Sequence, residues 1–175
     1  MGERAVFPGS FRPFHNEHLE KVREILETYP SQSLTIVVSD KCLSPKRYNF
    51  ICGKDALEIV LLTLKAEKLD EVVSVRLIDL DPNSSLEKLG SALIGNENVK
   101  RVFTGSEGTI KTIQLLRDRG LWNGELVQLN NSGIHAEQIR QLMLEDNPSW
   151  KEYVHSSVTN YLENVKQNFL GGLKS

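Results

Sequence analysis

The chain has 175 residues, of which 39% are hydrophobic and 25% charged, and its 21 basic and 23 acidic side chains give a formal net charge of −2. These proportions are typical of a globular protein, and the length suits one domain over residues 1–175 with a sizeable core. A near-neutral balance argues against a broad nucleic-acid-binding face, which would need a basic excess. A small, local phosphate site remains compatible with it.

The sequence also bounds the compartment and the oxidation state. No stretch reaches the roughly 18 consecutive apolar residues of a membrane span, and the N-terminus lacks the long apolar core of a signal peptide. We therefore expect a cytoplasmic protein with no membrane partner. Cys42 and Cys52 fit no zinc or redox spacing, so we expect two reduced thiols. The helical C-terminal part could pack on its own sheet or on a second copy, which leaves a homo-oligomer open.

Short β-branched runs alternate along the chain with longer amphipathic segments. The predicted strands are residues 4–7, 34–39, 72–80, 99–104 and 125–129. The predicted helices are residues 18–28, 54–65, 84–93, 107–117, 135–145 and 150–169. Strands that alternate with helices need crossover connections. We therefore predict an α/β fold, Rossmann-like and doubly wound, with a mainly parallel five-stranded sheet and a helical C-terminal extension.

The turn after the first predicted strand carries the most chemistry. Gly9 would let the backbone turn tightly and approach a ligand, and Asn16 is a good N-cap for the helix that follows. His15 and His18 are three residues apart, so they share one face of the first helical turn. Imidazoles beside the free amides of a helix N-terminus make a phosphate clamp. The residues alone also allow two ordinary surface histidines, whereas a metal site would lack further ligands.

Two motifs carry a resemblance to a known family. The segment GSFRPFHNEH at residues 9–18 resembles the first signature of the nucleotidylyltransferase superfamily, and with Leu19 it is most similar to that of archaeal-type nicotinamide mononucleotide (NMN) adenylyltransferases. The segment IHAEQIR at residues 134–140 falls at the place of the second signature. The chain departs from the family pattern at Glu17, which replaces a glycine, and at His135 and Glu137, which replace Ser and Thr.

The resemblance implies a set of site residues. The catalytic ones would be His15 and His18 at the α- and β-phosphates of ATP, Arg140 at the leaving pyrophosphate and Arg47 beside the transferring group. The residues that the resemblance places around the nucleotide are Gly9, Ser10, Phe11, Lys46, Gly105, Ser106, Ile134 and His135. Mg²⁺ would accompany ATP, held by the nucleotide and water, and no metal site made by the protein itself is expected.

The function that the resemblance implies is transfer of AMP from ATP to a phosphate-bearing acceptor, with release of pyrophosphate. NMN or nicotinate mononucleotide is the expected acceptor. Phosphopantetheine adenylyltransferase and cytidylyltransferase activities of the same superfamily are alternatives. The substitutions at His135 and Glu137 leave open a third, a catalytically weak nucleotide-binding sensor.

Overall fold

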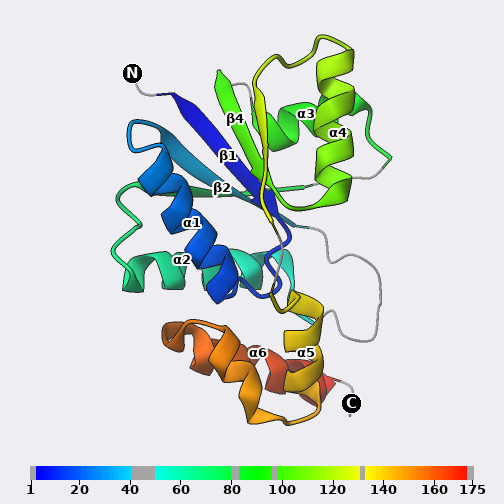
Figure 1. Cartoon of the computed structure of the whole chain (residues 1–175). Coiled ribbons are helices and arrows are strands. Elements are labelled where there is room, and N and C mark those ends of the chain that lie inside the picture. The colour runs from blue at the N-terminus through cyan, green and yellow to red at the C-terminus, as the bar shows by residue number, and fades with distance from the viewer. Residues whose placement is uncertain (1–2, 41–49, 80–82, 96–97, 131–132, 173–175) are drawn as a thin grey trace.

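The computed structural model describes residues 3–40, 50–79, 83–95, 98–130 and 133–172 (Figure 1). Cys42, Lys46 and Arg47 therefore lie outside the described residues. The elements, in chain order, are β1 (Arg4–Gly9), α1 (Asn16–Thr28), β2 (Ser33–Ser39), α2 (Gly53–Ala66), β3 (Val73–Ile78), α3 (Leu86–Ile94), β4 (Val99–Thr104), α4 (Glu107–Asp118), β5 (Glu125–Gln128), α5 (Ala136–Leu144), two short 3₁₀ helices η1 (Pro148–Tyr153) and η2 (Ser156–Val158), and α6 (Thr159–Gly172).

The strands form one five-stranded sheet in the order β3-β2-β1-β4-β5, and every neighbouring pair is parallel. After β1 the chain moves outward to β2 and β3, then returns to β4 on the other side of β1. The order of strands thus reverses between β1 and β4, which is the topological switch point of a doubly wound fold. The predicted fold class is confirmed.

Side chains of each strand alternate between the two faces of the sheet, and helices cover both faces. Ala5 and Phe7 of β1 belong to a core cluster shared with α1, α2 and the C-terminal helices, whereas Val6 belongs to a second cluster shared with α3 and α4. Figure 1 shows the same division, with α1 and α2 on one side of the sheet and α3 and α4 on the other. No helix in the described residues is long and apolar enough to cross a membrane.

Strand β1 continues two residues beyond its predicted end, and these residues pair with only one of its two neighbouring strands. Pro8 and Gly9 pair with Val37 and Val38 of β2, but pairing with β4 stops at Val6. A proline fits here because it lacks the N–H that a fully paired central strand would donate. Beyond Val6, β1 and β4 are therefore free to separate. At the other edge β3 is shorter than predicted, since Val72 precedes the strand and is 56% exposed.

The predicted single helix over residues 150–169 is wrong. The chain forms η1, passes through Val154 in an extended conformation (φ −118°, ψ 157°), forms η2 and only then begins α6. The break has a local cause at His155, whose Nδ1 accepts a hydrogen bond from the Ser157 N–H at 3.2 Å. Such a side-chain acceptor competes with the carbonyl that a continuing helix would offer to that N–H.

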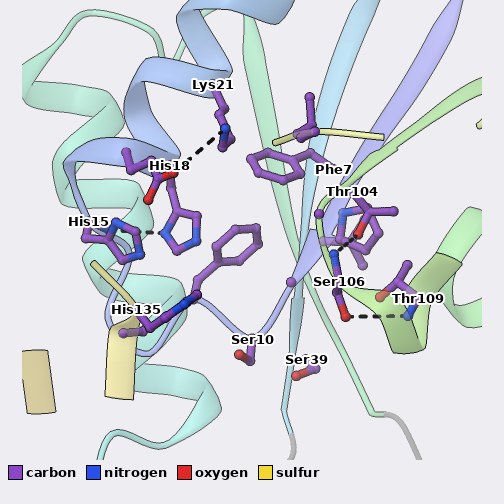
Figure 2. Close-up of a pocket in the computed structure, with 18 of the residues that line it drawn as sticks. Phe7, Ser10, His15, His18, Lys21, Ser39, Thr104, Ser106, Thr109 and His135 are labelled. Atoms are coloured by element: carbon purple, nitrogen blue, oxygen red, sulfur yellow. Dashed lines mark hydrogen bonds and ion pairs between the residues drawn. The ribbon is translucent and has the colours of Figure 1, made fainter. Parts of the chain in front are cut away.

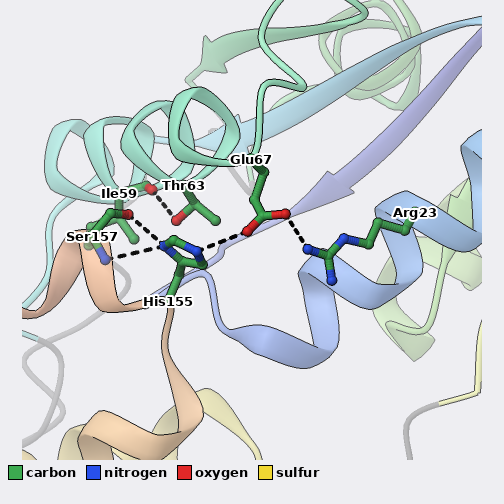
Figure 3. Close-up of polar contacts among 6 residues, drawn as sticks. All are labelled: Arg23, Ile59, Thr63, Glu67, His155 and Ser157. Atoms are coloured by element: carbon green, nitrogen blue, oxygen red, sulfur yellow. Dashed lines mark hydrogen bonds and ion pairs between the residues drawn. The ribbon is translucent and has the colours of Figure 1, made fainter.

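His155 also fastens this C-terminal part to the rest of the molecule (Figure 3). Its Nε2 lies 3.0 Å from Glu67 Oε1 at the end of α2, and its Nδ1 lies 2.8 Å from Ser157 Oγ. Arg23 of α1 pairs with the other oxygen of Glu67 and, with help from His155, lowers the pKa of that carboxyl.

A second contact between the C-terminal part and α2 is the hydrogen bond that the Tyr161 hydroxyl donates to Asp55 at 2.9 Å. Cys52, beside Asp55, is a free thiol.

Candidate active site

A cavity of about 380 Å³ lies at the carboxyl ends of β1 and β4, where the two strands separate. Its walls come from the β1–α1 turn, the first turns of α1, the β4–α4 turn and the start of α5 (Figure 2). Of the residues predicted for the site, those that line it are Gly9, Ser10, Phe11, His15, His18, Gly105, Ser106, Ile134 and His135. The topology explains their meeting, because the carboxyl ends of parallel strands share one edge of the sheet.

The two imidazoles of the first motif lie against each other on one wall (Figure 2). Their ring centroids are 3.7 Å apart, and the His15 backbone N–H donates to His18 Nδ1 at 3.3 Å. Since Nδ1 of His18 is an acceptor, the neutral ring carries its proton on Nε2 and keeps that N–H as a donor. Phe14 stacks on His18 with centroids 5.4 Å apart, and Phe11 meets it edge-on at 5.0 Å. The rings are thus held by aromatic packing and one backbone contact.

Burial keeps both histidines neutral at pH 7. His15 is only 4% exposed, and loss of solvation lowers its pKa to about 4, although Glu17 partly opposes the shift. The pKa of His18 is also well below its usual value, first because of burial and then because of His15 and Lys21. Within the described residues, Nδ1 of His15 has no hydrogen-bond partner. The pair therefore presents neutral donors in a partly dry site, where an arriving anion would favour protonation.

The opposite wall is the start of α4. Ser106 caps this helix by accepting the Thr109 N–H at 3.4 Å, and its own N–H donates to Thr104 Oγ1 at 3.1 Å. Gly105 and Ser106 both line the cavity. The helix N-terminus therefore brings its partial positive charge to the wall that faces the imidazoles. Figure 2 shows Thr104, Ser106 and Thr109 together across the cavity from His15 and His18.

Gly9 is required for a reason that differs from the expected one. A Cβ at Gly9 would lie 2.7 Å from Cζ of Phe11, so the glycine makes room for that aromatic ring rather than only for a ligand. The sharp turn is made by Phe11, whose φ is +48°, an unusual value for a large side chain. Phe7 packs edge-on against the same ring at 5.3 Å.

Arg140 does not line the cavity in the described residues. It lies one turn inside α5 and donates to the carbonyl of Arg12, so it supports the β1–α1 turn from behind. Partial burial lowers its pKa, although this arginine is still charged at pH 7. Arg12, itself 2% exposed, donates to the Ser39 carbonyl at the end of β2 at 2.7 Å. The two arginines thus connect α5, the motif turn and β2.

Several lining residues escaped the motif-based prediction. Lys21 lies one helical turn beyond His18 and reaches the cavity. Glu17, already noted as a departure from the family pattern, lines it too. The spacing of three residues from His18 is the signal that indicates Lys21. Ser39, Thr104 and Thr109 carry no such local signal, because only the fold brings them there. Among the described residues there is no group of three or more His, Cys, Asp or Glu placed to hold a metal ion.

Fold and cavity together define a Rossmann-like protein: a doubly wound parallel sheet with paired histidines at its switch point. No family model matches the chain. It is similar over 93% of its length to archaeal nicotinamide-nucleotide adenylyltransferases, as the motifs predicted. The enzyme of Sulfurisphaera tokodaii is 29% identical over 163 residues, which is 92% of that protein. The enzyme of Thermococcus sibiricus is 26% identical over 165 residues, or 84% of its length.

Solved structures agree on the fold. A bifunctional NMN adenylyltransferase/ADP-ribose pyrophosphatase from Francisella tularensis, complexed with AMP and an Mn ion, superposes with a TM-score of 0.64 at 20% identity. The match covers 88% of this chain but 44% of the bifunctional protein, so the chain spans less than half of that protein's length. Thermotoga maritima TmcAL bound with α-thio ATP superposes with a TM-score of 0.59 at 13% identity, covering 98% of this chain and 56% of TmcAL.

Proposed function

We propose that this chain is an adenylyltransferase that joins the AMP moiety of ATP to nicotinamide mononucleotide and releases pyrophosphate. The observation that carries the proposal is the similarity to archaeal enzymes of this name over 93% of the chain, with the first signature motif set in a cavity at the switch point. Such a reaction uses freely diffusing nucleotides, and we place it in the cytoplasm.

The reaction needs little covalent help from the protein. An oxygen of the acceptor phosphate attacks the α-phosphorus of ATP, the new P–O bond forms, and the α–β bond breaks with its electron pair on pyrophosphate. Phosphate is already a nucleophile, so the protein contributes position and stabilisation of charge. His18 would donate its Nε2–H to a phosphate oxygen, and His15 beside it would gain a proton more readily once that anion is bound.

The remaining groups have supporting roles in the proposal. The start of α4, capped by Ser106, would face the nucleotide from the opposite wall. Arg140 would act through the motif turn that it holds, or reach a terminal phosphate directly. Lys46 and Arg47 would neutralise the phosphates, a role that rests on the family resemblance alone. Mg²⁺ would arrive with the triphosphate, because this ion keeps most of its waters and binds substrate phosphates.

The sensor alternative rested on His135 and Glu137, and the second would repel a triphosphate if it faced the site. In the described residues Glu137 is exposed and is not among those that line the cavity. It lies instead near Arg140 and raises the pKa of that guanidinium, which opposes the effect of burial. The position of Glu137 outside the cavity lining therefore supports catalysis over sensing.

The test is a product assay on the whole chain. Purified protein with ATP, Mg²⁺ and NMN should form a dinucleotide and pyrophosphate in equal amounts. Parallel reactions replace NMN by nicotinate mononucleotide or phosphopantetheine, or replace ATP by CTP. His18→Ala should lose the activity, and Ser157→Ala, on the far exposed surface, should retain it. Absence of pyrophosphate with every acceptor would contradict the proposal, and a faster reaction with phosphopantetheine would change the substrate.

A further inference from the structure

Glu17 occupies the middle of the histidine motif, where a carboxylate beside a phosphate site would be expected to repel the ligand. The structure gives it a specific contact instead. Its Oε1 accepts the Gly133 backbone N–H at 3.3 Å, across 116 residues of sequence. A Cβ at position 133 would lie 2.7 Å from Glu17 Oε2, so the carboxylate is packed directly on this glycine. Gly133 is therefore suited to its position by its lack of a side chain.

Lys21 makes a matching contact one turn further along α1. Its ammonium group donates to the Asn130 carbonyl and lies 4.0 Å from Glu17 Oε1. The side chains of Lys21 and Glu17 are only 12% and 19% exposed. Asn130 follows the end of β5 and Gly133 precedes α5, so the two side chains hold the β5–α5 connection near both of its ends.

This connection delivers α5 to the cavity. His135, two residues after Gly133, lines the cavity and forms the N-cap of α5. Its N–H donates to the Gln138 side chain at 2.8 Å, so the first turn of α5 is internally ordered as well. The place of His135 and of the α5 amides therefore depends on where the connection meets α1. Any displacement of this connection would move His135 and the α5 amides relative to a phosphate bound between α1 and α5.

We propose that Glu17 and Lys21 form a clasp, defined as these two side chains with Asn130 and Gly133, that positions the start of α5 for phosphate binding. Glu17 is a positioning residue in this clasp. Lys21 has two tasks: it holds Asn130 and it compensates the negative charge of Glu17 at the cavity wall. The role in phosphate binding rests on the proposed function, whereas the clasp itself is a structural claim that can be measured separately.

Substitutions separate the hydrogen bond from the charge. Glu17→Ala removes both, and the KM for ATP should rise about tenfold with a smaller change in kcat. Glu17→Gln keeps an oxygen for the Gly133 N–H, so its KM should stay within about threefold of the wild type. Lys21→Met removes the ammonium group beside the Glu17 carboxylate and the contact with Asn130, and it should raise KM about tenfold. The double variant Glu17→Gln/Lys21→Met should recover part of that loss, because the offending charge is gone. Glu20→Ala, an exposed change on the same helix, is the control.

Hydrogen exchange of the Gly133 amide, followed by NMR, tests the clasp without reference to activity. Glu17→Ala should speed exchange about tenfold, and Glu17→Gln and Glu20→Ala should leave it near the wild-type rate. Unchanged exchange in Glu17→Ala would overturn the clasp. Faster exchange with an unchanged KM for ATP would overturn its role in phosphate binding. If the wild type turns over no ATP, the proposed function fails, and the exchange rates still decide whether the clasp exists.

Discussion

Two histidine sites in this molecule differ in how their polar atoms are satisfied. His155 has a carboxylate 3.0 Å from one ring nitrogen and a serine hydroxyl 2.8 Å from the other, and it ties the C-terminal helices to α2. His15 and His18 lie against each other in a cavity, and their contacts are aromatic rings and one backbone N–H. A fully paired histidine holds parts of a protein together. In the proposed function, the desolvated pair at the switch point receives the anion instead.

The largest expected effect is at the cavity. His18→Ala should lower kcat/KM by about 2–4 kcal/mol of transition-state stabilisation, roughly 30- to 1000-fold, by comparison with other electrostatic donors. The unfolding free energy should change far less, because the ring lies at a cavity wall. Steady-state pyrophosphate release and urea unfolding of the same preparation check both parts. A variant with wild-type turnover would remove His18 from the mechanism.

The next effect concerns pH. His15 has a folded pKa of about 4 and an ordinary value of 6.5, so between these values the unfolded chain binds a proton that the folded chain does not. Stability is therefore retained above pH 6.5 and lost as pH falls toward 4, by about 2 kcal/mol at pH 5 for this group alone. His18 shifts in the same direction.

Urea unfolding of the ligand-free protein at pH 7.5, 6 and 5 measures this loss. His15→Gln should flatten the profile. The contact between His155 and Glu67 loses stability in a different pH range. The lowered pKa of Glu67 stabilises the fold above its ordinary value of 4.5, and this contribution is lost only as the pH falls below 4.5. A wild-type profile that is level from pH 7.5 to 5 would contradict neutral, buried imidazoles.

His155 should affect stability more than activity, which is the reverse of the effect expected for His18. His155→Ala removes one partner of Glu67, which keeps Arg23, and the acceptor for the Ser157 N–H, so the unfolding free energy should fall by about 1–2 kcal/mol. In a chain of this length that lowers Tm by about 2–8 °C. The kcat should stay within about twofold. A variant as stable as the wild type but inactive would erase the distinction between the two sites.

The smallest effect is expected at Ser157. Its exposed hydroxyl contacts His155 Nδ1, but the backbone N–H of Ser157 satisfies the same nitrogen. Ser157→Ala should therefore change stability by less than about 0.5 kcal/mol. Thermal unfolding beside His155→Ala gives the comparison. A loss as large as that of His155→Ala would mean that the hydroxyl, rather than the carboxylate, holds this region.

The sequence was informative where a pattern is local. Alternating β-branched and amphipathic runs predicted the sheet and its helices, and the 9–18 motif predicted the histidine wall of the cavity. Contacts between distant segments were not accessible in this way. The break before α6 depends on how His155 is shared between Ser157 and Glu67.

The same limit applies within the site. Arg140 matched a family motif, yet it contacts the carbonyl of Arg12 instead of lining the cavity. A carboxylate at position 17 is unexpected beside an anion site. Its contact with Gly133 could not be predicted, because the two residues are 116 positions apart in the sequence. A motif indicates which residue types gather, but the fold decides which of them line the cavity.

The most direct test of the account follows the imidazole nitrogens by ¹⁵N NMR while ATP and Mg²⁺ are added. We predict that the His15 and His18 signals shift, with His15 moving toward its protonated form and His18 keeping its proton on Nε2, while the His155 signals stay in place. Shifts at His155 as large as those at His15 and His18, or no shift at any of the three, would contradict the claim that this pair is the nucleotide's phosphate site.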